Sequence, residues 1–111
     1  MKKIYGGRYK MAILVKRLAK GQLNTTKYQV YTVPVGTTTI VKAITICNGS
    51  NGDVQFDIEF AGEYIIFNHT IKGYDTITIP FIDQVLHSGE KISVRSTNAS
   101  AKFFISGKEV T

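Results

Sequence analysis

The sequence contains no tryptophan, two prolines and a single cysteine among its 111 residues. A single cysteine, Cys47, excludes an intrachain disulfide, and its place in an apolar strand pattern predicts an inert, buried thiol. No segment approaches the roughly 20 consecutive apolar residues of a membrane-spanning helix, so we expect no membrane insertion. No long stretch has the 3.6-residue period of a helix, and no group of histidine, cysteine and carboxylate residues has the spacing of a metal site. The sequence therefore predicts an all-β protein without a metal or another cofactor.

Acidic residues are absent from the first 20 positions, although the whole chain has a formal net charge of +6. Seven of the 14 lysines and arginines lie in these positions, and the other seven face eight acids, so residues 21–111 sum to −1. We therefore divide the chain into a basic N-terminal arm, residues 1–22, and a β-sandwich domain, residues 23–111. Such an arm can contact nucleic acid, an acidic partner or nothing at all.

Binding of nucleic acid is not expected from the rest of the chain. Residues 5–10 alternate tyrosines with basic residues, as a binder of single strands can do. No comparable basic and aromatic face is evident in the domain, because the polar face of its clearest strand carries Asp57 and Glu59. Nucleic-acid binding is therefore not expected, and a solvated tail and a contact with an acidic partner remain as the alternatives for the arm.

Short runs of β-branched and aromatic residues, with turn signals about every 8 to 12 residues, extend from Tyr28 to the end of the chain. Residues 54–60 are the clearest strand, since apolar and polar side chains alternate strictly there. This pattern predicts an antiparallel β-sandwich, jelly-roll-like, of about seven to eight strands. The predicted core comprises Ile40, Ile44, Ile46, Val54, Phe56, Ile58, Ile77, Ile79, Ile92, Val94, Phe103 and Ile105.

The polar residues at strand faces and strand ends predict no catalysis. Asp57 and Glu59 share a strand face and could form a carboxylate pair for glycoside cleavage. They alternate with core residues as solvent-facing positions should, and no aromatic platform is evident beside them, so we do not expect an enzyme. Four Asn-X-Ser/Thr triplets lie at strand ends, where asparagine side chains stabilise turns. These predicted turn residues are Asn24, Asn48, Asn68 and Asn98.

Adjacent phenylalanines near the C-terminus predict a contact surface. Side chains next to each other in a strand point to opposite faces, so an inward Phe103 turns Phe104 outward. We expect Phe104 to lie near Tyr64 or Ile66 on neighbouring strands and to mark a contact with another subunit. The arm is expected to contribute to this contact, and the candidate contact residues are Arg8, Lys16, Arg17, Lys20 and Phe104. The predicted assembly is a homo-oligomer, and the expected oligomer is a trimer.

Several short motifs resemble those of a known group of proteins. Val30-Tyr31-Thr32-Val33-Pro34, the strand 41–48 that ends in asparagine, Leu86-His87-Ser88-Gly89-Glu90 and the final Ser106-Gly107-Lys108-Glu109 carry the likeness, which covers most of residues 11–110. The chain thus resembles small virion-associated proteins of tailed bacteriophages of Gram-positive hosts, including the shoulder domains of lactococcal phage receptor-binding proteins. The basic extension before Met11 departs from that pattern, and we expect Met11 to be the natural start.

The resemblance implies a β-sandwich that attaches to a larger particle, and it supplies no catalytic residue. The expected function is that of a non-enzymatic structural or interaction protein of a tailed phage particle, in the tail, the neck or as a head accessory. Its expected partners are other virion proteins and its own copies, and its expected location is the virion, after synthesis in the bacterial cytoplasm. A carbohydrate-binding or host-receptor-binding β-sandwich module is the alternative, which aromatic residues exposed together would favour.

Overall fold

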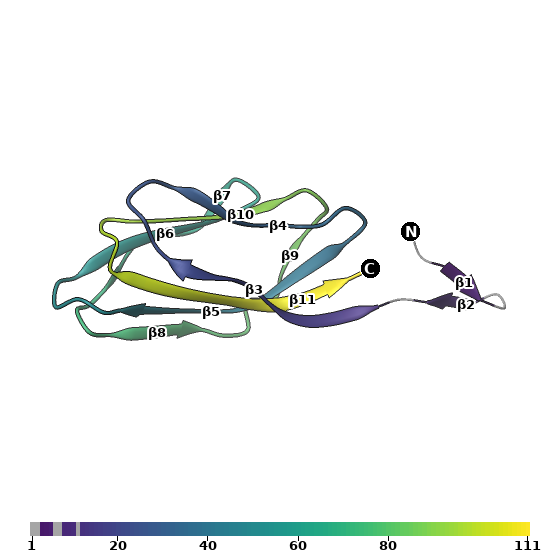
Figure 1. Cartoon of the computed structure of the whole chain (residues 1–111), viewed down its shortest axis with the longest axis horizontal. Coiled ribbons are helices and arrows are strands. Elements are labelled where there is room, and N and C mark those ends of the chain that lie inside the picture. Colours follow the sequence, from purple (N-terminus) through teal and green to yellow (C-terminus); the bar gives the residue numbers. More distant parts are fainter. Residues whose placement is uncertain (1–2, 6–7, 11) are drawn as a thin grey trace.

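The computed structural model describes residues 3–5, 8–10 and 12–111, and it describes side chains from residue 12 onward. Two antiparallel sheets pack face to face (Figure 1). The larger sheet has the order β3 (Ile13–Gln22), β11 (Ala101–Val110), β5 (Thr38–Asn48) and β8 (Thr76–Ile79), and β9 (Gln84–Leu86) also pairs with β5. The smaller sheet has the order β4 (Tyr28–Thr32), β10 (Lys91–Ser96), β6 (Val54–Phe60) and β7 (Glu63–Ile71). A separate two-stranded sheet pairs β1 (Lys3–Tyr5) with β2 (Arg8–Lys10).

The strand pairs nest inside one another along the chain. The hairpin β6–β7 lies innermost in sequence, and the pairs β5–β8, β4–β10 and β3–β11 enclose it in turn. Successive pairs alternate between the two sheets, so a long folded-back hairpin is wrapped into a sandwich. This is the jelly-roll arrangement, and the predicted fold class is confirmed.

Within the described residues, the sandwich has nine strands, because the strand after β7 is divided into β8 and β9. Pro80 lacks the N–H group that a ladder needs, and the chain turns away from β5 at this point. Phe81 and Asp83 then take positive φ angles of 58° and 51° before β9 resumes the pairing. The segment 81–87 is thus an irregular loop followed by a short strand.

The core confirms nine of the twelve predicted residues, which are Ile44, Ile46, Val54, Phe56, Ile58, Ile92, Val94, Phe103 and Ile105. Ile77 and Ile79 are half-buried, since β8 is an edge strand with one open side. Ile40 is also half-buried, and its neighbour Val41 takes the core position in its place. The prediction was wrong at Ile40 because β5 changes face between Val41 and Ile44.

Two β-bulges meet at the same level of β11 and cause this change of face. Between Ser106 and Gly107, the pairing of β11 with β5 skips one residue, and between Ile105 and Ser106 its pairing with β3 also skips one. The extra residues are Lys42 in β5 and Leu18 in β3. Each bulge reverses the alternation of its strand while β11 itself alternates without interruption.

Gly107 permits this close approach of three strands. A Cβ atom at this position would lie 2.2 Å from the carbonyl oxygen of Ile40 and 3.0 Å from Cδ1 of Leu18. The first distance is far inside van der Waals contact with backbone, which cannot move aside as a flexible side chain can. Only glycine fits the junction without displacing β5.

Asn48 ties several turns together at the far end of β5. Its side chain is 1% exposed and donates to the carbonyl oxygens of Gly52, Ile71 and Lys72 at 2.8, 3.2 and 3.2 Å. Its Oδ1 accepts hydrogen bonds from the backbone N–H and the hydroxyl of Ser50. Asn98 likewise accepts from the backbone N–H of Ser100 at 3.0 Å, so the predicted turn chemistry is confirmed at these two triplets.

Cys47 is exposed, and the prediction of a buried thiol was wrong. After the bulge, even-numbered residues of β5 face the core, so Ile46 and Asn48 point inward and Cys47 points outward. Its cross-strand neighbours are Lys102 and Thr76.

Truncation of either fully buried phenylalanine should leave a cavity in the core. We expect Phe56→Ala and Phe103→Ala each to lower the free energy of unfolding by about 3–5 kcal/mol. Phe104→Ala, one residue away but half-exposed, should cost less than about 1 kcal/mol. Urea denaturation followed by circular dichroism measures all three, and equal losses at Phe103 and Phe104 would contradict the assignment of faces.

Substitution at the junction of the bulges should be destabilising although it adds one methyl group. We expect Gly107→Ala to lower the free energy of unfolding by about 1–3 kcal/mol, because β5 or Leu18 must shift to admit it. Gly52→Ala is the matched control, since a Cβ there meets no atom within 4 Å. A Gly107→Ala protein as stable as the Gly52→Ala protein would show that the three strands are not locked together at this point.

Candidate functional site

The outer face of the larger sheet carries a cluster of basic side chains around an exposed phenylalanine. Phe104 of β11 is 51% exposed and lies between Lys20 of β3 and Thr45 of β5 in the register of the sheet. The surface defined here as the basic face consists of Arg17, Lys20, Lys102, Phe104 and Lys108. The outward positions of β3, β11 and β5, strands that the structure describes from end to end, hold no aspartate or glutamate.

Two side chains of the basic face contact each other, and a third is held by a residue at the end of β3. The guanidinium carbon of Arg17 lies 5.5 Å from the centre of the Phe104 ring, which is a cation–π contact. Such a contact is worth about 0.5–1 kcal/mol at an exposed site, enough to favour one arrangement of two side chains. Lys102 Nζ donates to Gln22 Oε1 at 2.7 Å, so this lysine leans toward the edge of the sheet. The face therefore presents an ordered patch with positive charge on both sides of an apolar ring.

The structure brings together three of the five predicted contact residues, Arg17, Lys20 and Phe104. Lys16 is separated from them, because the bulge at Leu18 turns it to the inner side of the sheet. The side chain of Arg8 lies outside the described residues. Lys102 and Lys108 were missed, although the regular alternation of residues 102, 104, 106 and 108 in the sequence could have placed them beside Phe104.

Two expectations about this region were wrong. Phe104 does not lie near Tyr64 or Ile66, because both belong to β7 in the other sheet. The domain does have a basic face with an exposed aromatic residue, although the sequence indicated none. The polar face that carries Asp57 and Glu59 belongs to β6 of the smaller sheet, so it says nothing about the larger one.

Lys16 forms part of a polar cluster at the end of the sandwich. Its Nζ lies 3.3 Å from Glu109 Oε1, and the hydroxyl of Tyr31 donates to Glu109 Oε2 at 2.5 Å. The same hydroxyl lies 2.7 Å from Thr39 Oγ1. Burial, together with the hydrogen bond to Glu109, raises the pKa of Tyr31 to about 12. The cluster thus links β3, β4, β5 and β11, and it contains no free nucleophile or base.

Asp57 and Glu59 are buried, 3% and 7% exposed, and the prediction that they face solvent was wrong. Asp57 accepts hydrogen bonds from Arg95 Nε at 2.7 Å and from the backbone N–H of Asn68 at 2.6 Å. Glu59 accepts from Lys27 Nζ at 2.7 Å. Both carboxylates are therefore satisfied by basic partners that cover them on the outer face of the smaller sheet.

An exposed aromatic pair lies next to these carboxylates, contrary to the expectation from the sequence. Tyr64 is opposite Glu59 in the register, and its ring centre lies 4.8 Å from that of Phe67 with 63° between the ring planes. The two side chains are 53% and 65% exposed. The sequence concealed the pair because two bulges in β7 change which residues share a face.

The described residues give no sign of a metal site or a membrane-spanning helix. They contain no group of three or more histidine, cysteine, aspartate and glutamate side chains arranged to hold a metal ion. No helix in the same part of the chain is long and apolar enough to cross a membrane.

No protein-family model matches the chain, and no curated protein sequence matches it. Solved structures do share its fold. A chain in the acid-stable capsid structure of Helicobacter pylori bacteriophage KHP30 matches all of this chain over 90% of its own length, with a TM-score of 0.55 and 13% identity. A chain of the T13 viral particle of infectious bursal disease virus matches 90% of this chain with a TM-score of 0.55 and 7% identity, and this chain spans only 30% of its length. The Drosophila NLP core, described for pentamer formation and histone binding, matches 85% of this chain over 98% of its own length, with a TM-score of 0.53 and 14% identity.

Alkaline pH should destabilise the protein through Tyr31. The folded state raises the pKa of this tyrosine from 10 to about 12, so the folded state favours its neutral form. The resulting stabilisation is complete below pH 10 and is lost as the pH rises from 10 to 12. Tyr31→Phe should flatten this part of the stability profile relative to the wild type, as thermal denaturation at pH 9 to 12 would show. Identical pH profiles for the two proteins would contradict the burial of the Tyr31 hydroxyl against Glu109.

Proposed function

We propose that this protein is a non-enzymatic structural component of a tailed phage particle, where it assembles with its own copies and attaches to another virion protein. The basic face is the observation that carries the proposal. It is broad, it contains no acid, and it has an exposed ring at its centre, as expected of a surface that meets an acidic protein partner. The jelly-roll fold that the chain shares with chains of two virus particles supports the proposal at the level of fold.

The finer assignments follow the motifs of the sequence. We propose a tail, neck or head accessory position in a phage of a Gram-positive host, with the segment 1–22 as the attachment arm. Ile13–Gln22 of this segment forms the edge strand β3, which aligns Arg17 and Lys20 with Phe104. The arm thus supplies two of the charges of the basic face, and we propose that the copies form a trimer.

Reversal of charge on the basic face should remove the protein from particles. We expect the double variant Lys20→Glu with Lys102→Glu to lower incorporation into particles at least about tenfold, because like charges then face the partner. Lys72→Glu is the control, since Lys72 is an exposed lysine in the turn between β7 and β8. The measurement is quantitative immunogold labelling and mass spectrometry of particles produced by a host that carries each variant. Absence of the wild-type chain from purified particles would overturn the proposal.

A second candidate function is the binding of carbohydrate or a host receptor, and the Tyr64–Phe67 pair favours it. Exposed aromatic rings provide apolar platforms beside polar groups, and Glu59 and Arg95 lie nearby on the same face. In this case Phe67→Ala would abolish adsorption of particles to host cells and leave incorporation unchanged. The structural proposal predicts that Phe67→Ala leaves adsorption unchanged as well.

A further inference from the structure

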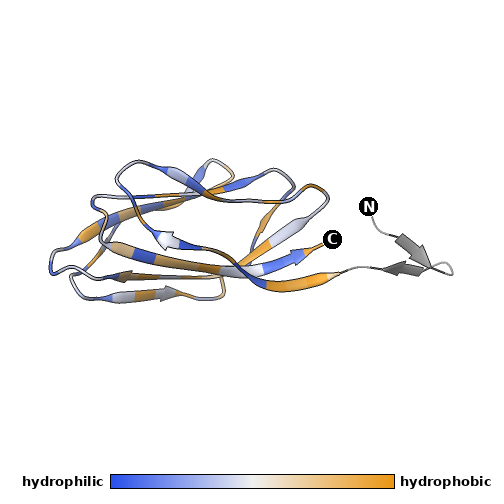
Figure 2. Ribbon diagram, viewed as in Figure 1, coloured by the Kyte–Doolittle hydropathy of each residue, from blue (hydrophilic) through white to orange (hydrophobic). Residues whose placement is uncertain are grey.

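Four consecutive apolar residues at the start of β3 are exposed. Ala12 is exposed, and Ile13, Leu14 and Val15 are 59%, 55% and 77% exposed. Figure 2 shows this first half of β3 as an apolar stretch at the end of the sandwich where the C-terminus also lies. Leu14 is on the inner side of the sheet with Glu109, and Ile13 and Val15 are on the outer side, so both faces of the strand are apolar. Exposed apolar runs of this length are unfavourable unless they serve a contact.

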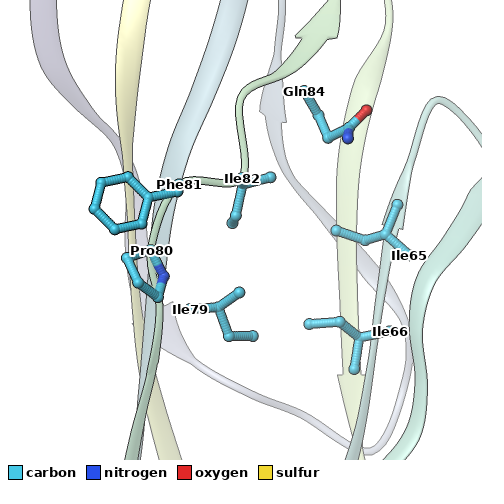
Figure 3. A pocket seen from close by; sticks show the side chains of 7 residues that line it. All are labelled: Ile65, Ile66, Ile79, Pro80, Phe81, Ile82 and Gln84. Atoms are coloured by element: carbon cyan, nitrogen blue, oxygen red, sulfur yellow. The ribbon is translucent and has the colours of Figure 1, made fainter.

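The opposite side of the sandwich has an apolar groove. It has a volume of about 470 Å³ and lies between the edge strand β7 of one sheet and β8 with the loop after it in the other. Ile65 and Ile66 form one wall, and Ile79, Pro80 and Ile82 form the other. Figure 3 shows Ile66 and Ile79 pointing toward one another across it. A segment that is apolar on both faces would remove the most apolar surface from water when it binds between two apolar walls.

These two surfaces cannot meet within one molecule. β3 and β8 are the opposite edges of the larger sheet, and β3 contacts β4, which is the edge of the smaller sheet opposite β7. The exposed start of β3 and the groove therefore face in opposite directions across the sandwich. Contact between them requires two copies of the chain.

The charges of the two regions are complementary. Residues 12–22 carry Lys16, Arg17 and Lys20 and no acid. Residues 63–87, which contain both walls of the groove, carry Glu63, Asp75 and Asp83 against Lys72, and Asp83 is also paired with Lys42 of β5. With Lys42 included, this region has three acids against two lysines, a net charge of −1. Unlike net charges favour the meeting of these two surfaces over the meeting of two β3 edges, where like charges would repel.

We propose that residues 12–15 of one copy seat in the groove between β7 and β8 of the next copy. The contact is head-to-tail, so each subunit contributes the start of β3 to one neighbour and the groove to the other. Repetition of such a contact gives a ring where the rotation between copies closes, and an open filament where it does not. The open edges of β3 and β8 allow backbone hydrogen bonds to add to the apolar contact. This inference rests on the proposed assembly role and specifies which surfaces carry it.

Cross-linking between differently marked copies tests the head-to-tail contact. In full-length protein with Cys47→Ser, we introduce Leu14→Cys in one preparation and Gln84→Cys, at the groove, in another of different mass. We expect disulfide-linked dimers on mild oxidation of the mixture, each with one chain of each mass. Their yield should be at least tenfold higher than the yield of dimers in either preparation alone. Dimers of equal yield from Leu14→Cys alone would show pairing of two β3 edges and would overturn it.

Sedimentation velocity gives a second readout that does not depend on oxidation. The wild-type chain should sediment as an oligomer at high micromolar concentration, and Leu14→Asp should shift it to the monomer. Val35→Asp is the control, because Val35 is 94% exposed and belongs to neither surface. A wild-type monomer throughout, or an oligomer unchanged by Leu14→Asp, would overturn the inference. Because these measurements use purified protein alone, they can fail while the chain is still found in particles, and the reverse also holds.

Discussion

The meeting of two bulges at Gly107 is the constraint on which the arrangement of side chains depends. At this level, β5 and β3 each carry an extra residue beside an uninterrupted β11, and only the absence of a side chain at Gly107 lets the backbone of Ile40 come so close. The bulge in β3 places Leu18 in the core and divides the basic residues of the strand between two faces. Arg17 and Lys20 therefore join Phe104 outside, whereas Lys16 joins Glu109 and Tyr31 inside.

The sequence was sufficient for the fold and for most of the core because both follow from simple alternation. β6, β10 and β11 keep a period of two through their core positions, and every core residue predicted in them is buried. The errors in the core are Ile40, beside the bulge of β5, and Ile77 and Ile79 on the edge strand β8. The exposed pair on β7 was missed because that strand is bulged. A bulge depends on what the neighbouring strand can admit, as at Gly107, and this information is not local in sequence.

Only part of the candidate site could be predicted from the sequence. The outward direction of Phe104 follows from its neighbour Phe103, and the basic character of β3 is visible in its composition. Which sheet these residues share was not visible, so Phe104 was placed near the wrong aromatic residues. The sequence also did not predict the burial of Asp57 and Glu59, because the groups that cover them, Arg95 and Lys27, come from distant positions in the chain.

A jelly roll of this kind leaves its functions to its faces and edges, since the interior is filled by side chains. The larger sheet offers a basic face, and the two sides of the sandwich offer an apolar strand and an apolar groove. A cryo-electron microscopy reconstruction of purified particles would show whether the chain is an assembling part of a virus particle. We expect density for a closed ring of sandwiches, with the face around Phe104 against another virion protein. Isolated sandwiches that present the Tyr64–Phe67 pair to solvent at a fibre tip, with the basic face free, would contradict this expectation.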